Sequence, residues 1–137
     1  MPTDERILGF SNRWYRPAME SAQRVQLEND LIIRVVTAPF FLGTKLEAFK
    51  GRGKNDYFAS HDLEDVIAVI DGRPPLLVEL RSESTELRAY VAHEVGDLLK
   101  QPNFIDALPG YLLPDPSSQA RLGELLTTLR AITELVG

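Results

Sequence analysis

One short run of β-branched residues constrains the fold more than any other feature of this 137-residue chain. Residues 31–37 read Leu-Ile-Ile-Arg-Val-Val-Thr, a composition that predicts a β-strand. A lone strand would leave its backbone N–H and C=O groups unpaired, and a stable sheet needs about three strands. The run must therefore pair with another segment. We consider residues 6–10, a second copy of this chain, and a sheet that belongs to a part missing from this sequence.

The remaining patterns are helical. Pro17 predicts the start of a helix that reaches about residue 27, with a turn at 28–30. Apolar spacings of three and four, with capping residues, predict six more helices over residues 39 to 51 or 53, 60–70, 74–81, 84–99, 103–108 and 117–136. We therefore predict an α+β, mainly α fold: a helical bundle with one strand, 31–37, at the edge of a small or incomplete sheet.

Length and composition narrow the class of protein. The length of 137 residues predicts a single domain, 1–137. The composition, with 44% hydrophobic and 26% charged residues, excludes a disordered tail. The absence of cysteine excludes disulfides, thiolate chemistry and sulfur-ligated zinc. No apolar run approaches the roughly 20 residues that span a bilayer, and the polar first residues do not resemble a signal peptide. We expect a cytoplasmic protein without a membrane partner.

The charge is low overall but unevenly distributed. A net charge of −5 argues against a general nucleic-acid-coating role. Residues 45–54 nevertheless contain four basic side chains against one acidic one, whereas residues 56–71 contain five acidic side chains and no lysine or arginine. A basic block beside an acidic block is the most unusual local feature of the sequence.

Lys45 is the most informative residue of the basic block. It lies one turn after Phe41 and one turn before Phe49 on an apolar stretch of its predicted helix. Burying an ammonium group costs several kcal/mol unless it is paired. Lys45 therefore either meets a phosphate or carboxylate in a cleft, or extends along the edge of the core with its charge in water. The loop predicted at 51–54 likewise either exposes backbone N–H groups to an anion or simply ends the helix; Ala48 and Asn55 exclude a P-loop.

Two other groups allow a functional and a structural interpretation. His61 and Asp65 are four residues apart, so they could contribute to a cation site or could belong to a capped, acidic first helical turn. Trp14, between two nearby arginines, could stack on a nucleobase or could anchor a loop in the core. With two histidines in the chain, a histidine-rich metal centre is excluded, and we predict no metal ligands.

The segment 39–65 reads PFFLGTKLEAFKGRGKNDYFASHDLED. It resembles the C-terminal region of the nucleotidyltransferase-like proteins of the AbiEii/AbiGii toxin group, which belong to the polymerase-β-type nucleotidyltransferase superfamily. The features that carry the resemblance are a helical lysine, then an arginine, then an Asp-x-x-Asp pair. Residues 9–15 also look like the segment after the last catalytic strand in that group, and the resemblance covers roughly residues 7–110.

The resemblance implies roles for individual residues. Lys45 would face a nucleoside triphosphate and, with Asp56, would take part in catalysis. Further implied roles are nucleotide or phosphate binding by Arg34, Arg52 and Lys54, and support of the cleft by Asp62 and Asp65.

The superfamily's metal-binding segment is missing here, because the sequence contains neither the Gly-Ser motif nor an Asp-x-Asp pair. We therefore expect Mg²⁺ and nucleoside triphosphate to be cofactors only if that segment is supplied. We expect no activity from the chain alone. We also expect Met1 to be an internal methionine of a longer reading frame. The family implies an RNA acceptor and a toxin-antitoxin context. The alternatives are a non-catalytic interaction module, in which strand 31–37 pairs in a homodimer or with a partner chain, and a truncated remnant.

Overall fold

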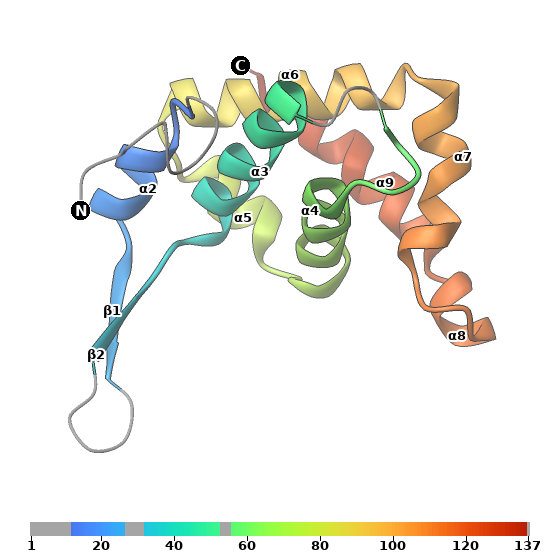
Figure 1. Ribbon diagram of the computed structural model, residues 1–137, viewed down its shortest axis with the longest axis horizontal. Coiled ribbons are helices and arrows are strands. Elements are labelled where there is room, and N and C mark those ends of the chain that lie inside the picture. The colour runs from blue at the N-terminus through green and yellow to red at the C-terminus, as the bar shows by residue number, and fades with distance from the viewer. Residues whose placement is uncertain (1–11, 27–31, 53–55, 137) are drawn as a thin grey trace.

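Helices make up most of what the computed structural model describes, namely residues 12–26, 32–52 and 56–136 (Figure 1). The α+β, mainly α class is confirmed. None of the described helices combines the length and the apolar character needed to cross a membrane. The elements in chain order are α2 (Tyr15–Glu20), β1 (Gln23–Gln26), β2 (Ile32–Val35), α3 (Ala38–Arg52), α4 (His61–Gly72), α5 (Leu76–Arg81), α6 (Thr85–Leu99), α7 (Pro102–Tyr111), α8 (Pro116–Gln119), α9 (Leu122–Thr133) and the 3-10 helix η2 (Glu134–Val136).

The predicted strand finds its partner immediately upstream. β1 pairs antiparallel with β2, with Gln23 opposite Val35 and Gln26 opposite Ile32. The prediction of a helix over 17–27 is therefore wrong beyond Glu20, because residues 23–26 are extended. Of the partners that we considered, residues 6–10 lie outside the described residues, and pairing with a second copy or with another part of the protein stays a prediction. An antiparallel partner needs only a short connection, and the backbone groups of the two strands then satisfy one another. The turn predicted at 28–30 falls outside the described residues.

The two helices at the centre of the chain begin as predicted. α3 ends at Arg52, so Gly51 and Arg52 belong to the helix and not to the predicted loop; residues 53–55 are not among those described. Ser60 caps α4, and its hydroxyl accepts a hydrogen bond of 3.2 Å from the Leu63 N–H. Such a cap satisfies one of the backbone donors that every helix start leaves unpaired.

The C-terminal helices differ from the prediction in two places. α7 is longer than the helix predicted over 103–108, because it begins at Pro102 and continues through Pro109 and Gly110 to Tyr111. The Pro109 carbonyl accepts a 2.9 Å hydrogen bond from the Gln119 side chain, so the last turn of α7 is bound to the next element. The single helix predicted over 117–136 is instead divided into α8, α9 and η2.

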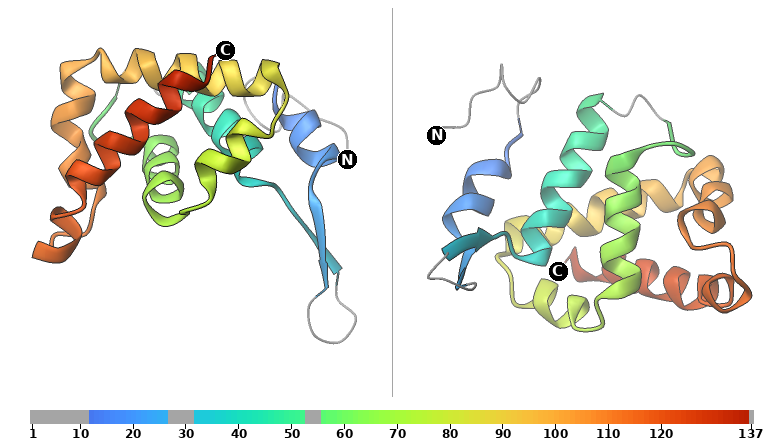
Figure 2. Two further views of the ribbon diagram at one scale, coloured as in Figure 1. Left: turned by 180° about the vertical axis from the view of Figure 1, so that it is seen from behind. Right: turned by 60° about the horizontal axis from the view of Figure 1, so that its bottom comes forward.

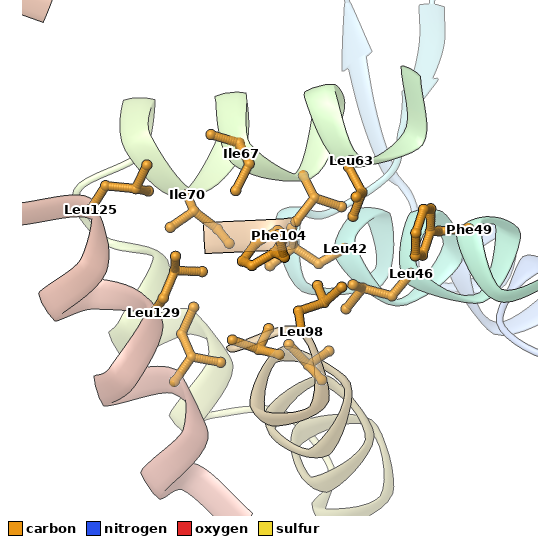
Figure 3. Packing of buried hydrophobic residues seen from close by; sticks show 14 of the residues in the cluster. Leu42, Leu46, Phe49, Leu63, Ile67, Ile70, Leu98, Phe104, Leu125 and Leu129 are labelled. Carbon is orange, nitrogen blue, oxygen red and sulfur yellow. The ribbon is translucent and has the colours of Figure 1, made fainter. Parts of the chain in front are cut away.

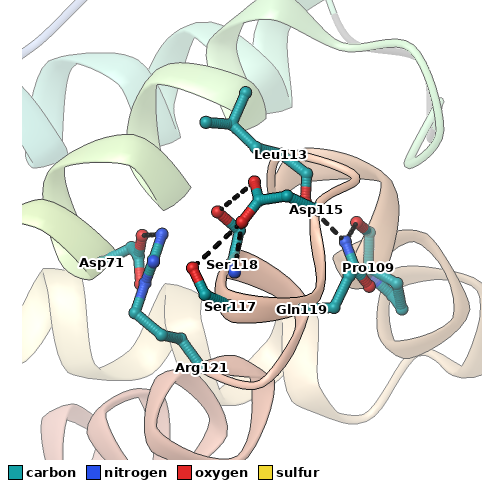
Figure 4. Close-up of polar contacts among 8 residues, drawn as sticks. All are labelled: Asp71, Pro109, Leu113, Asp115, Ser117, Ser118, Gln119 and Arg121. Carbon is teal, nitrogen blue, oxygen red and sulfur yellow. Dashed lines mark hydrogen bonds and ion pairs between the residues drawn. The ribbon is translucent and has the colours of Figure 1, made fainter.

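Polar contacts explain where the helix predicted over 117–136 is interrupted (Figure 4). Asp115 caps α8 by accepting hydrogen bonds from the Ser118 N–H and hydroxyl, and the hydroxyl bond is the largest cause of a lowered pKa at this carboxyl. Arg121, between α8 and α9, forms two hydrogen bonds of 3.2 and 3.0 Å with the Asp71 carboxylate at the end of α4. The chain therefore changes direction where these long-range contacts form.

A single large cluster of apolar side chains forms the core of the helical body. Phe104 of α7 is fully buried among side chains from α3, α4 and α9 (Figure 3). Gly43 allows α3 to approach its neighbours closely, because a Cβ atom there would lie 2.9 Å from Leu87 Cδ1 and 3.4 Å from Trp14 Cγ. The hairpin lies outside this core and projects from the helices, as Figure 1 and the left view of Figure 2 show.

Candidate functional site

Lys45 and the two aspartates that we expected to support the cleft, Asp62 and Asp65, come together between α3 and α4. Lys45 Nζ lies 2.9 Å from Asp65 Oδ2 and 3.7 Å from Asp62 Oδ1. The side chain of Lys45 is 26% exposed, that of Asp62 only 7%, and that of Asp65 41%. The ammonium group is therefore held by two carboxylates, one buried and one accessible.

Lys45 has carboxylate partners in this structure, whereas a phosphate at its ammonium group stays a prediction. The charged end is partly buried and ion-paired, as expected for an ammonium group drawn out of bulk water. Nζ also lies 5.6 Å from the centre of the Phe41 ring, a further favourable contact for a cation. Asp62 lies in the first turn of α4, where the helix dipole favours a carboxylate. The three side chains carry a net charge of −1, so an anionic ligand would have to replace a carboxylate partner.

A cavity of about 480 Å³ lies beside this cluster. Phe41 connects the two, because its ring lines the cavity and also faces the Lys45 ammonium group. A cavity of this size with a mainly apolar wall and few polar groups is typical of sites for small molecules. The other lining residues are Gln23, Val35, Val36, Thr37, Ala38, Ala68, Val69, Gly72, Arg73 and Glu79.

The two charged side chains of the cavity wall, Arg73 and Glu79, are paired with each other. Arg73 donates two hydrogen bonds, of 2.7 and 2.5 Å, to the Glu79 carboxylate. This contact raises the pKa of Arg73 and lowers the pKa of Glu79. Thr37 precedes α3, and its hydroxyl oxygen is buried without a hydrogen-bond partner. Sequence reasoning missed this cavity, because its wall combines the hairpin with three helices that are separated in the chain.

Of the other predicted site residues, only the Asp56 side chain has contacts that the structure describes. The Asp56 carboxylate accepts hydrogen bonds from the Phe58 and Ala59 N–H groups, at 3.3 and 3.1 Å, and so orders the approach to α4. The described contacts of the Asp56 carboxylate do not include Lys45, so their shared cleft stays a prediction. The backbone of Arg34 lies in the hairpin, and that of Arg52 in the last turn of α3. Lys54 is outside the described residues.

A second cavity, of about 360 Å³, lies between α3 and α6. On its wall Lys50 Nζ lies 3.3 Å from Glu94 Oε2. His93 Nδ1 lies 3.5 Å from both Glu94 and Asp97, and one ligand atom from each of these three residues lies within 4.8 Å of the others. The helical spacing of His93 and Asp97 was visible in the sequence, but the convergence of Lys50 on Glu94 was not.

The other two sequence groups have structural roles. His61 is almost fully exposed and its Nδ1 lies 3.5 Å from Glu64, within the capped, acidic first turn of α4. Trp14 is buried in the core, as the loop-anchor interpretation requires, and the Arg13 guanidinium lies 4.6 Å from the centre of its ring. A buried ring of this kind offers no face to a nucleobase.

Comparisons with known proteins identify no relative. Neither the scan against protein-family models nor the searches of curated proteins and of solved structures found a match.

Proposed function

We propose that this chain is the helical, nucleotide-facing half of a nucleotidyltransferase-like protein, as the resemblance of residues 39–65 implies. The observation that supports it best is the partly buried Lys45 ammonium group, which Asp62 and Asp65 hold beside an apolar cavity. In this proposal Lys45 contacts the phosphates of a nucleoside triphosphate. The cavity beside it receives the apolar part of the ligand.

The two aspartates have different tasks in the proposal. Asp62 is buried and keeps the lysine in position, whereas Asp65 is accessible and gives way to a phosphate oxygen. A charge-assisted hydrogen bond between an ammonium group and phosphate contributes about 1.5–3 kcal/mol. The roles of Asp56, Arg34, Arg52 and Lys54 rest on the resemblance alone.

Transfer chemistry needs more than this chain contains. Nucleotidyl transfer depends on metal ions that position the triphosphate and neutralise its charge. The sequence has no Gly-Ser motif and no Asp-x-Asp pair to hold them. We therefore propose that Mg²⁺ and an RNA acceptor are used only when another polypeptide segment supplies those carboxylates. The proposal places the protein in the cytoplasm, where nucleoside triphosphates and RNA are available, in a toxin-antitoxin context.

The test compares two lysines of the same helix. Binding of Mg·ATP is measured by isothermal titration calorimetry for the unaltered chain, for Lys45→Ala and for Lys50→Ala. Lys50 is the matched control, since it is also ion-paired but lies at the second cavity. We expect Lys45→Ala to weaken binding about 10- to 100-fold, as loss of one charge-assisted hydrogen bond predicts, and Lys50→Ala to change it less than threefold. Equal effects of the two substitutions, or no binding by the unaltered chain, would contradict nucleotide binding at Lys45.

A transfer assay tests the second half of the proposal. The chain is incubated with labelled nucleoside triphosphates, Mg²⁺ and RNA acceptors, and we expect no labelled product. Robust transfer that disappears in Lys45→Ala would show that the chain is a complete enzyme.

A second candidate function, an interaction module, is favoured by one specific observation. All four residues of β1 are exposed, although the strand is part of a sheet. A homodimer or a partner chain could pair with this hairpin. Light scattering during size-exclusion chromatography distinguishes a monomer from a dimer.

A further inference from the structure

A group of metal-ligating side chains lies on α6, away from the Lys45 cluster. His93 Nδ1 lies 3.5 Å from Glu94 Oε2 and 3.5 Å from Asp97 Oδ2. One potential ligand atom from each of the three residues lies within 4.8 Å of the other two. His93 and Asp97 share one face of the helix because they are four positions apart, and Glu94 adjoins them. The group therefore presents one imidazole nitrogen and two carboxylates within reach of a single ion.

The separations within this group fit an ion better than they fit hydrogen bonds. A hydrogen bond from an imidazole N–H to a carboxylate oxygen normally spans about 2.7–3.2 Å, which is shorter than both contacts of His93. Ligand atoms that lie about 2.0–2.1 Å from a tetrahedral Zn²⁺ ion are about 3.3–3.4 Å apart. The two separations of 3.5 Å are close to this value. The side chain of Asp97 is 52% exposed, so it can rotate to bring the third separation to the same length.

The position of the group on α6 also favours a cation. Asp97 lies in the last turn of the helix, where the negative end of the helix dipole disfavours a carboxylate, and that turn contains no basic residue. Glu94 adds a second carboxylate, whose side chain is only 12% exposed. Two carboxylates this close repel each other unless a positive charge compensates them. A divalent ion that binds both carboxylates removes this repulsion.

Two lysines already supply part of the compensating charge. Lys50 Nζ lies 3.3 Å from Glu94 Oε2, and Lys100 Nζ lies 4.0 Å from Asp97 Oδ1. Both lysine side chains are at least half exposed, and ion pairs of such side chains contribute little to stability. A metal ion that bonds directly to the Glu94 carboxylate therefore replaces Lys50 at low cost. Lys50 is a competitor of the ion, and this competition can be measured.

The second cavity lies directly beside the group. Glu94 and Asp97 both line this space of about 360 Å³. Three protein ligands leave one position of a tetrahedral zinc ion open to water or to another ligand, as in catalytic rather than structural zinc sites. The cavity provides room for such a ligand, and Leu46, Phe49 and Leu98 form its apolar wall.

The donor atoms select the class of ion. Mg²⁺ and Ca²⁺ prefer sites made of oxygen ligands alone, whereas Zn²⁺ accepts imidazole nitrogen together with carboxylate oxygen. The expectation of no metal ligands followed from the count of two histidines in the chain. A site with one histidine and two carboxylates does not need the second histidine.

We propose that His93, Glu94 and Asp97 bind one Zn²⁺ ion at the edge of the second cavity, with one coordination position open to an exchangeable ligand. The ion takes the place of Lys50 at the Glu94 carboxylate. This site does not depend on nucleotide binding at Lys45.

The test measures metal binding by the whole chain, prepared without an affinity tag. ZnCl₂ and MgCl₂ are titrated into the protein at pH 7.5 by isothermal titration calorimetry. We expect one Zn²⁺ ion per chain, with an affinity at least about 100-fold higher than that for Mg²⁺. Histidine side-chain ¹⁵N resonances then identify the ligand in the unaltered protein, because those of His93 should shift on addition of Zn²⁺ and those of His61 should not.

Matched histidine and lysine variants locate the ion. His93→Ala should weaken Zn²⁺ binding at least about tenfold. His61→Ala should change it less than about twofold, although His61 Nδ1 also lies 3.5 Å from a carboxylate of its own helix. Lys50→Ala should strengthen binding about two- to fivefold, because the competing ammonium group is removed, whereas Lys45→Ala should leave it unchanged. Far-ultraviolet circular dichroism verifies that each variant retains its helices.

A spectroscopic measurement tests the open position. Co²⁺ replaces Zn²⁺ as a coloured probe, and sodium azide is added to the Co²⁺-loaded protein. We expect azide to shift the visible absorption bands of the bound ion. An unchanged spectrum would mean that the coordination shell is closed and would overturn the exchangeable position.

Three other results would overturn the site itself. The first is a dissociation constant for Zn²⁺ above about 1 mM. The second is an equal loss of binding in His93→Ala and His61→Ala, which would show nonspecific binding to histidine. The third is a set of His93 ring resonances that do not respond to Zn²⁺, which would place any bound ion elsewhere.

Discussion

The helical body and the hairpin of this protein are stabilised in different ways. In the body, buried side chains from α3, α4, α5, α6, α7 and α9 form one apolar cluster, and the backbone of each helix satisfies its own hydrogen bonds (Figure 3). In the hairpin, β1 and β2 satisfy one another's backbone groups, and all four residues of β1 are exposed. The body therefore depends on burial, whereas the hairpin depends on pairing.

Truncation of a large side chain in each region gives the largest expected difference. Phe104→Ala removes a fully buried ring and should lower the free energy of unfolding by about 3–5 kcal/mol, because a cavity remains. Val25→Ala on the hairpin should lower it by less than about 0.5 kcal/mol. Urea unfolding followed by circular dichroism measures both. Similar losses for the two variants would mean that the hairpin is part of the cooperative core.

Substitution of two glycines compares a tightly packed position of the body with a loosely packed one. Gly43→Ala puts a methyl group 2.9 Å from Leu87 Cδ1 and should cost about 1–2 kcal/mol of stability, after a gain in helix propensity is allowed for. Gly96→Ala meets Thr133 Cγ2 at an ordinary 3.8 Å and should stabilise α6 by up to about 1 kcal/mol. Thermal unfolding of the two variants should therefore shift in opposite directions. A shift in the same direction would show that the approach at Gly43 relaxes easily.

Alkaline pH should produce the smallest of these effects, and only in the body. Burial, followed by the hydrogen bond to Glu47, raises the pKa of Tyr90 well above its ordinary value. The unfolded chain ionises this phenol near pH 10 while the native chain keeps its proton, so the contribution of Tyr90 is complete below pH 10 and is lost as the pH rises further.

The loss at pH 11 should be below about 1 kcal/mol, because the ring is only partly shielded from solvent. Unfolding free energies measured between pH 8 and 11 should fall less steeply for Tyr90→Phe than for the unaltered chain. Val25→Ala should follow the unaltered chain in parallel. An unchanged slope in Tyr90→Phe would mean that this phenol titrates normally.

Local signals in the sequence predicted the helices of the body well. Ser60 and Ser84 are cap residues at the expected positions, since a cap acts within one turn of its own helix. The errors lie where distant contacts intervene. Arg121 binds Asp71, fifty positions earlier in the chain, and the helix predicted over 117–136 is divided there. Residues 23–26 form a strand because β2 is available to pair with them. The spacing of apolar side chains at three or four residues gives no information about such pairing.

The candidate site shows the same division between local signals and contacts of residues far apart in the chain. The resemblance assigned Lys45, Asp62 and Asp65 to one cleft, and the lysine also stood out among the apolar residues of its own helix. It also grouped Asp56 with them, yet that carboxylate binds the backbone of its own turn. The cavity beside Phe41 could not be predicted, since its wall comes from the hairpin, α3, α4 and Arg73 and Glu79 after them.

The sequence by itself determined where most helices begin, which of their faces are apolar, and which segment must be a strand, because these depend on residues within a few positions of one another. Only the tertiary structure decided that the strand pairs with its upstream neighbour, that Lys45 meets two aspartates of α4, and that an apolar cavity opens beside them. Those outcomes depend on how helices and strands pack across the chain, and packing is selected by the total burial and pairing of the whole molecule.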